Sequence, residues 1–252
     1  MVIAFSRLIS LPLVNSISTK EASVKRPATI IIAALIVIML YAPGRGLALD
    51  NASEAKEIID QAEVTLKNFL NDPDMKWFAS HLQESKGVYI IPRLTKGSFV
   101  FGVEGGNGVV LARDEKAGTW SEPVFYEASA ASFGLQAGAK FQEAIVLIRT
   151  QKAVDSLLAN KFKFGADGSV AIGPKGMGAD TTLMTDFVTF ARAKGLYAGV
   201  SFEGAFLRAR DDLNAAYFGE KVRASDIMIA HKAKPNPNSK ELHGILAAAP
   251  KE

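Results

Sequence analysis

The fold is decided by residues 87–114, which read GVYIIPRLTKGSFVFGVEGGNGVVLARD. Within this stretch, the segments 87–94, 98–104 and 108–114 are rich in β-branched and aromatic residues and are separated by turn-forming residues, which is typical of β-strands. Gly105, Gly106 and Asn107 tolerate positive φ, so we expect a hairpin turn at 105–107. The short spacing indicates antiparallel neighbours, because a parallel crossover needs about a dozen residues or more.

Similar segments downstream extend this sheet: 119–127, 133–140, 143–150, 169–173 and 195–209. Several glycines fall inside the predicted strands: Gly102, Gly134, Gly138, Gly199 and Gly204. Glycine weakens the interior of a strand, so its repetition indicates sharp bends or a close approach of the backbone. The pattern therefore predicts a strongly curved sheet or a small barrel.

Helical patterns lie before and between the strands. Apolar residues at helical spacing predict a helix over 51–70, which begins with a capping box of Asn51 and Glu54. The polar face of this helix mixes acidic and basic residues. Such a face favours packing of the helix on its own domain over insertion into a membrane. Shorter helices are expected over 75–83 with Asp74 as cap, over 151–160, and over 211–219. The fold class that follows is α+β, with N-terminal helices packed on a curved, mainly antiparallel β-sheet or partial barrel.

The first 48 residues have the features of a signal peptide. Lys25 and Arg26 precede an apolar run over 28–42, and small residues at Gly46 and Ala48 match a cleavage site near Ala48–Leu49. An uncleaved N-terminal anchor is the alternative. We therefore expect an exported chain, periplasmic or secreted, with a domain over 49–231 and a flexible C-terminal tail over 232–252, where a Pro/Asn-rich stretch begins.

Composition excludes several kinds of site. The chain has no cysteine, so disulfides, thiolate metal sites and cysteine nucleophiles are excluded. The formal charge of +3 comes from the leader, so the pI does not indicate a nucleic-acid partner. The histidines are scattered, and we expect neither a metal site nor a cofactor.

Motifs for catalysis are missing from the sequence. The glycine-rich loops 102–108 and 173–178 lack the helix start or the G-K-[ST] ending that would hold a phosphate. Asp211 and Asp212 suit the start of a helix better than acid–base chemistry. We predict that the chain is not an enzyme; an enzyme with an unrecognised site near Lys175 and Asp180 is one alternative.

Basic residues gather in the final third of the chain: Arg192, Lys194, Arg208, Arg210, Lys221 and Arg223. Two interpretations stay open for them. They are ordinary solvated surface with weak ion pairs, or they form a patch that contacts lipid phosphates.

Several motifs in order resemble the SYLF-domain family, which comprises lipid-binding and actin-regulating adaptors of eukaryotes, of the WASP-binding type, and exported bacterial members. Residues 195–204 (GLYAGVSFEG), 217–219 (YFG) and 223–228 (RASDIM) resemble its C-terminal signature. Lys86-Gly87, the run 97–113, the GTW of 118–120, 151–158 (QKAVDSLL) and 169–176 (SVAIGPKG) resemble its earlier elements, so the resemblance covers roughly residues 51–230.

The resemblance implies a non-catalytic lipid- or phospholipid-binding domain, here of the cell envelope, because eukaryotic members are associated with phosphatidylinositol-containing membranes and with actin. An envelope structural or protein-interaction module is the alternative. The expected partner is an anionic phospholipid or membrane surface, and a protein partner stays open. Actin is a candidate partner only because eukaryotic members of the family are associated with it. The resemblance points to Lys56, Lys67 and Lys86 as lipid contacts. To these we add the basic residues Lys175, Arg192, Lys194, Arg208 and Arg210.

Overall fold

The computed structural model describes residues 50–98, 102–132, 140–159, 161–175, 184–198 and 201–250. The chain divides into two units, Met1–Ala48 and Leu49–Glu252, and the second unit contains all of the described residues. Our expectations for the leader lie outside the described residues. So do Asp180, the predicted strand glycines Gly134, Gly138 and Gly199, and most of the predicted strand over 133–140.

Helix α2 (Asn51–Leu70) confirms the predicted helix at both ends. It begins differently from our expectation, because the cap is Asp50, whose Oδ1 accepts from the backbone N–H groups of Ala52 and Ser53 at 3.0 and 2.9 Å. Its apolar face is buried, with Ile59, Leu66 and Phe69 fully enclosed. Burial of each such side chain contributes about 1.5–3 kcal/mol to the stability of the fold. The helix is therefore stabilised by packing on its own domain, as we expected from its mixed polar face.

The next helix is shorter than predicted. A 3-10 turn, η1 (Pro73–Met75), leads into α3 (Lys76–His81). Asp74 is not the cap of the helix: the carboxylate of Asp72 caps η1 by accepting from the N–H of Asp74 at 2.9 Å, and α3 begins after Met75 without a side-chain cap. Proline at the first position of η1 fixes the entry angle of the chain, which explains why the turn begins there.

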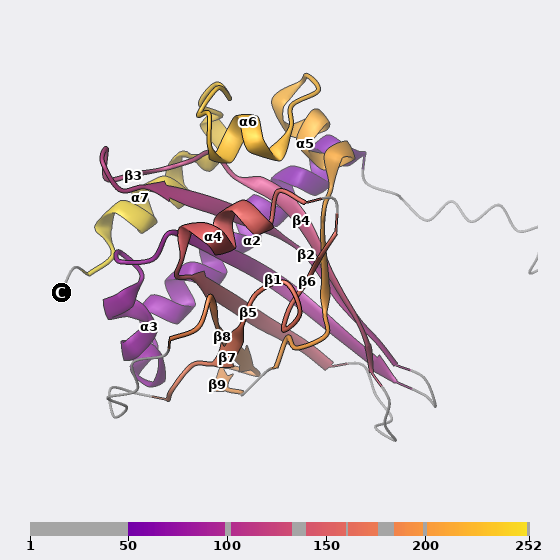
Figure 1. Ribbon diagram of the computed structural model, residues 1–252, viewed down its shortest axis with the longest axis vertical. Coiled ribbons are helices and arrows are strands. Elements are labelled where there is room, and N and C mark those ends of the chain that lie inside the picture. Colours follow the sequence, from indigo (N-terminus) through magenta and orange to yellow (C-terminus); the bar gives the residue numbers. More distant parts are fainter. Residues whose placement is uncertain are drawn as a thin grey trace, which may run out of the picture. The chain divides into compact units, whose positions relative to one another are not determined.

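The strands form one curved sheet in the order β6-β10-β4-β2-β1-β5-β8-β7, with β3 paired to β2 and β9 paired to β8 (Figure 1). Every pairing is antiparallel except that of β7 with β8, which confirms the α+β prediction with a mainly antiparallel sheet. The strands are β1 (Gly87–Ser98), β2 (Gly102–Asp114), β3 (Thr119–Trp120), β4 (Val124–Ser132), β5 (Lys140–Ile148), β6 (Phe162–Lys163), β7 (Val170–Ile172), β8 (Phe187–Ala193), β9 (Leu196–Tyr197) and β10 (Phe206–Ala209).

The predicted hairpin at 105–107 is wrong, because these residues lie inside the continuous strand β2. Gly105 pairs with Thr95 of β1 and with Ser129 of β4, so both edges of the strand are occupied. A Cβ at Gly106 or Gly108 would collide with backbone carbonyls of β1, next to the irregular register between Ile90 and Thr95. Glycine here permits close approach at a bulge, which bends the sheet.

The predicted strand over 195–209 is likewise divided. This range contains two strands, β9 and β10. Between them Gly204 has a φ of 81°, which lies outside the β region, so one continuous strand cannot pass through it. Strand β8 completes the sheet between β5 and β7, although we did not predict it.

Each face of the sheet is covered. Val88, Ile90 and Phe125 face α2 and α3, whereas Tyr89 and Val110 face α4 (Gln151–Ser156), Phe162 and Phe164 on the other side. Alternate residues of β1 therefore enter different cores, as the period of a strand requires. Helix α4 ends earlier than the predicted 151–160 and is capped by Thr150, whose Oγ1 accepts from the N–H of Ala153.

The C-terminal part is more ordered than predicted. Helices α5 (Asp211–Phe218), α6 (Ala224–Met228) and α7 (Lys240–Ala248) follow β10, and η2 (Pro237–Ser239) precedes α7. The expected flexible tail over 232–252 is wrong for α7, whose Leu242 and Leu246 are fully buried in the core that α2 shares. An ion pair of 2.8 Å between Lys67 and Glu241 also joins α2 to α7. No helix among the described residues is long and apolar enough to cross a membrane.

Candidate functional site

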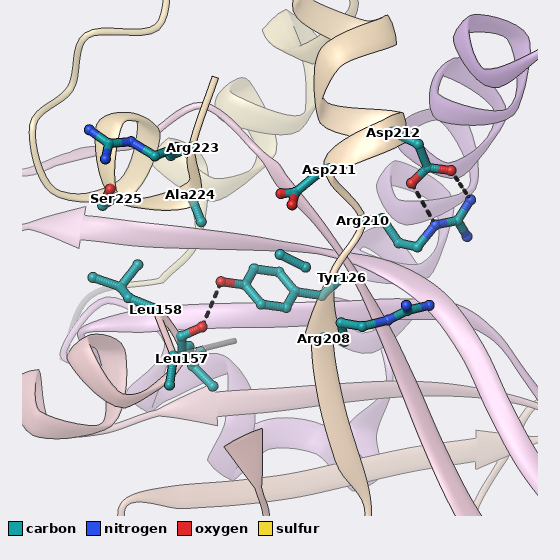
Figure 2. A pocket seen from close by; sticks show the side chains of 12 residues that line it. Tyr126, Leu157, Leu158, Arg208, Arg210, Asp211, Asp212, Arg223, Ala224 and Ser225 are labelled. Atoms are coloured by element: carbon teal, nitrogen blue, oxygen red, sulfur yellow. Dashed lines mark hydrogen bonds and ion pairs between the residues drawn. The ribbon is translucent and has the colours of Figure 1, made fainter. Parts of the chain in front are cut away.

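A pocket of about 710 Å³ opens where β10 and α5 meet the chain that follows α4 and the start of α6 (Figure 2). We call it the arginine pocket. Its lining residues are Tyr126, Leu157, Leu158, Ala159, Arg208, Ala209, Arg210, Asp211, Asp212, Arg223, Ala224 and Ser225. The lining combines guanidinium groups, carboxylates and a few apolar side chains from four separate segments.

Arg208 comes from the short strand β10. Leu207 points into the core and is 1% exposed, so its neighbour Arg208 points outward by the alternation of a strand. Its Nη2 donates to Oε2 of Glu127, the residue directly opposite on β4, at 2.8 Å. The side chain of Arg208 is 63% exposed, so water screens this ion pair, and its contribution is below about 1 kcal/mol.

Arg210 is held far more firmly. Its Nε and Nη2 donate to both carboxylate oxygens of Asp212 at 2.9 and 2.7 Å, and its Nη1 donates to Oδ1 of Asn107 at 3.1 Å. The hydrogen bond with Arg210 lowers the pKa of Asp212. Such a bidentate pair fixes both side chains, so Arg210 forms a rigid wall of the pocket between β2 and α5.

Arg223 is the most exposed arginine of the pocket. It precedes α6, its side chain is 83% exposed, and its Nε donates to Oδ2 of Asp226 at 3.1 Å. This hydrogen bond lowers the pKa of Asp226. Because the pair lies at the surface, its guanidinium is able to turn toward a ligand at little cost.

Tyr126 forms the floor of the pocket. Its hydroxyl donates to the carbonyl oxygen of Leu157 at 2.9 Å, as the dashed line in Figure 2 shows. Burial, with a smaller effect from Asp211, raises the pKa of Tyr126 well above its ordinary value. The hydroxyl is therefore protonated at neutral pH and engaged, which suits a fixed support and not a general base.

The lining of the arginine pocket consists of hydrogen-bond donors, carboxylates and apolar side chains. The pocket contains no histidine or cysteine, and its one serine, Ser225, has no base beside it among the lining residues. In the described part of the chain, no group of histidines and acids has the arrangement of a metal site. Guanidinium groups donate paired hydrogen bonds to oxyanions, so a phosphate or carboxylate is the ligand that the pocket suits.

The structure separates most of the predicted lipid contacts. Lys56 pairs with Asp60 on α2 itself, Lys67 with Glu241, Lys86 with Glu115, and Lys175 with Asp74 at 3.2 Å. Lys56 and Lys67 lie on α2, Lys86 precedes β1 and Lys175 follows β7, and none of them lines the arginine pocket. Only Arg208 and Arg210 of the predicted contacts line that pocket.

Arg192 and Lys194 meet at a second pocket of about 350 Å³, beside the turn between β8 and β9. Arg192 is 13% exposed and pairs with Asp72 at 2.7 Å and with Glu143 at 3.1 Å. The other lining residues are Asn68, Pro92, Gln142, Glu143 and Gly195. We call it the turn pocket.

Sequence reasoning missed Tyr126, Ser225 and the apolar lining. Arg223 belonged to the basic cluster that we noted, but it was not among the predicted contacts. Its place within RASDIM, a motif of the family resemblance, is the signal that points to it.

Comparisons with known proteins agree with the motifs. Residues 129–249 match the Ysc84 family model, described as "Las17-binding protein actin regulator". The chain is 27% identical over 197 residues to SH3 domain-containing YSC84-like protein 1 of Homo sapiens, covering 76% of this chain and 56% of that protein. It is 30% identical over 172 residues to LAS seventeen-binding protein 3 of Saccharomyces cerevisiae, covering 66% and 37%. The chain thus spans about half the length of the curated relatives that it matches first, or less.

Proposed function

This chain belongs to the Ysc84 family, and we propose that it acts as a non-catalytic binding domain whose arginine pocket takes the head group of an anionic phospholipid. The observation that carries the proposal is that Arg208 and Arg210 of one segment and Arg223 of another line the same open pocket. The family description supports a binding protein, and the lipid is our inference from the chemistry of the pocket.

The arginines of the pocket have different roles in binding. Arg210 is fixed by Asp212 and Asn107 and shapes the wall. Arg208 and Arg223 are held only by exposed ion pairs, with Glu127 and Asp226. The guanidinium groups of Arg208 and Arg223 point to opposite sides in Figure 2. Each would turn toward the pocket to donate paired hydrogen bonds to a phosphate, which replaces its weak ion pair by a stronger contact. Leu158 and Ala224 supply apolar surface for the glycerol end of the lipid.

Vesicle co-sedimentation tests this proposal. We expect the chain to sediment with phosphatidylcholine vesicles that contain phosphatidylserine, more than with phosphatidylcholine alone, and to be released as salt screens the charges. The double variant Arg208→Ala/Arg223→Ala should lose this preference.

The matched control is Lys116→Ala/Lys240→Ala, which removes the same charge from exposed positions outside the pocket. It should retain the preference. If both double variants lose the preference for phosphatidylserine equally, net charge and not the pocket attracts the lipid. If the wild-type chain sediments equally with both kinds of vesicle, the proposal is overturned.

A protein partner is the second candidate, and the names of the relatives support it. The yeast relative is named for binding Las17. Cross-linking of the chain to one protein in its native extract, with no lipid retained after purification, would favour this function over lipid binding.

We place this activity in the cell envelope, in line with the signal-peptide pattern of residues 1–48. Mass spectrometry of the chain recovered from its host tests the proposal. The expected mass corresponds to cleavage near Ala48–Leu49, and an N-terminus that retains Ile30–Met39 would contradict it.

A further inference from the structure

We propose that the turn pocket is a second binding site, for a small oxyanion that carries hydroxyl groups, of the glycerol phosphate class. It lies at the β8–β9 turn, and none of its lining residues belongs to the arginine pocket. The inference therefore stands apart from the proposed function. It rests on a strained lysine, a buried acceptor without a partner and a guanidinium with spare donors.

Lys194 occupies a backbone position that disfavours it. Ala193 pairs with Leu196, so Lys194 and Gly195 form a two-residue hairpin turn. Their φ values are 52° and 78°. Positive φ at both positions is the geometry of a type I′ turn, for which Asn-Gly is the preferred pair. A lysine here loses stability, and a strained residue of this kind is expected where a function needs its side chain.

The charge of Lys194 is available to a ligand. The side chain is exposed at the rim of the turn pocket, and no carboxylate of the described residues forms an ion pair with it. The neighbouring acids are already engaged, since Asp72 and Glu143 both pair with Arg192. An entering anion therefore meets an ammonium group without an ion-pair partner among the described residues, while the carboxylate of Glu143, which also lines the pocket, is neutralised by Arg192.

Arg192 adds hydrogen-bond donors to the same pocket. Its Nε, Nη1 and Nη2 donate to Asp72, Glu143 and the carbonyl oxygen of Gly195. A guanidinium has five N–H groups, so these bonds leave others for a ligand. An ammonium beside a partly occupied guanidinium is a suitable receptor for a phosphate.

Gln142 supplies the complementary acceptor. Its Oε1 is buried and has no hydrogen-bond partner within the described chain, and its residue lines the pocket. A buried acceptor of this kind costs stability unless a donor reaches it. A hydroxyl of the ligand is such a donor, so the ligand class combines an anionic group for Lys194 with a hydroxyl for Gln142.

Isothermal titration with sn-glycerol 3-phosphate tests the site. Propyl phosphate, which lacks the carbon-bound hydroxyls, and glycerol, which lacks the charge, are the comparison ligands. We expect glycerol phosphate to bind more tightly than either. Equal affinity for glycerol phosphate and propyl phosphate, or no binding of glycerol phosphate, would overturn the proposal.

The decisive variant is Lys194→Asn. Asparagine suits the type I′ turn, so thermal unfolding should occur at the same temperature as in the wild type or a higher one, while the affinity for glycerol phosphate falls about tenfold or more. Lys175→Asn is the matched control, because it removes an exposed lysine outside the pocket, and it should bind as the wild type does. Unchanged affinity in Lys194→Asn would contradict the assignment.

Two further variants separate the contributions. Gln142→Leu should lower the affinity for glycerol phosphate to that for propyl phosphate, and an unchanged preference would remove Gln142 from the site. Arg208→Ala/Arg223→Ala should lose any glycerol phosphate binding that belongs to the arginine pocket and keep the binding that Lys194→Asn removes, so failure of the arginine pocket and failure of this site give different results. Phosphatidylglycerol vesicles offer a glycerol phosphate diester on a lipid, and titrating them beside free glycerol phosphate into Arg208→Ala/Arg223→Ala, which lacks the arginine pocket, tells a membrane source from a soluble one.

Discussion

Arg192 is enclosed far more deeply than Arg208, although sequence reasoning placed both among the same predicted contacts. Its side chain is 13% exposed and its partner Asp72 is 9% exposed, whereas Arg208 is 63% exposed. Removing one member of an enclosed ion pair leaves the other charge without compensation. The identity of a basic residue says nothing about this difference, because burial is set by contacts with residues far away in the sequence.

The two arginines should differ in what their removal does to stability. Arg192→Ala should lower the free energy of unfolding by about 3 kcal/mol, since Asp72 and Glu143 lose their cation. Arg208→Ala should change it by less than about 1 kcal/mol. Urea unfolding of the two variants measures both values, and similar small losses would show that Arg192 is not a structural ion pair.

Asp212 predicts how stability depends on pH. Its folded-state pKa is lowered by the hydrogen bond from Arg210, below an unfolded value of about 3.9. The stabilisation is therefore present above that unfolded pKa and is lost as the pH falls through the folded pKa. In urea unfolding, Asp212→Asn should be less stable than the wild type at neutral pH, and the difference should shrink in acid. A difference that stays constant down to acid pH would contradict this assignment.

At the scale of elements, the glycines of β2 show what local patterns predict and what they miss. A glycine cluster between two apolar runs favours a hairpin by its turn chemistry. The structure uses Gly106 and Gly108 for close approach to β1 instead. Which of these roles a glycine takes depends on the partner strand, and no local pattern encodes the partner strand.

A pair of alanine substitutions tests this role. Gly108→Ala should destabilise the fold, because the added Cβ would collide with the carbonyl oxygen of Ile90 in an ordered strand. Gly244→Ala in α7 should stabilise it by up to about 1 kcal/mol, because no atom lies within 4 Å of that Cβ and alanine favours a helix. Thermal unfolding compares them, and equal tolerance of both changes would argue against close packing at β2.

Elements with strong local signals were predicted well. Helix α2 matches its predicted range because its apolar residues recur at helical spacing and one face is fully buried. Strand β8 was missed although its seven residues, FVTFARA, are rich in β-branched and aromatic residues, as are the strands that were predicted. Helix α7 was missed because the proline and asparagine residues before it indicate a loop, while its burial against α2 comes from tertiary packing.

For the whole molecule, the sequence predicted the α+β class and the family but not the order of the strands. The arginine pocket joins Tyr126, the chain after α4, the end of β10 and the start of α6 (Figure 2). Sequence reasoning found Arg208 and Arg210, which adjoin the motifs of the resemblance, and left Tyr126 unnoticed. The sheet order brings these segments together, so the pocket was not predictable from local spacing.

The most direct test of the central claim is an NMR titration of the ¹⁵N-labelled chain with a short-chain, water-soluble phosphatidylserine. We expect amide shifts to concentrate at residues 208–212 and 223–225, and Arg208→Ala/Arg223→Ala to abolish them. Shifts that spread along α2 and leave the arginine pocket unchanged would contradict it.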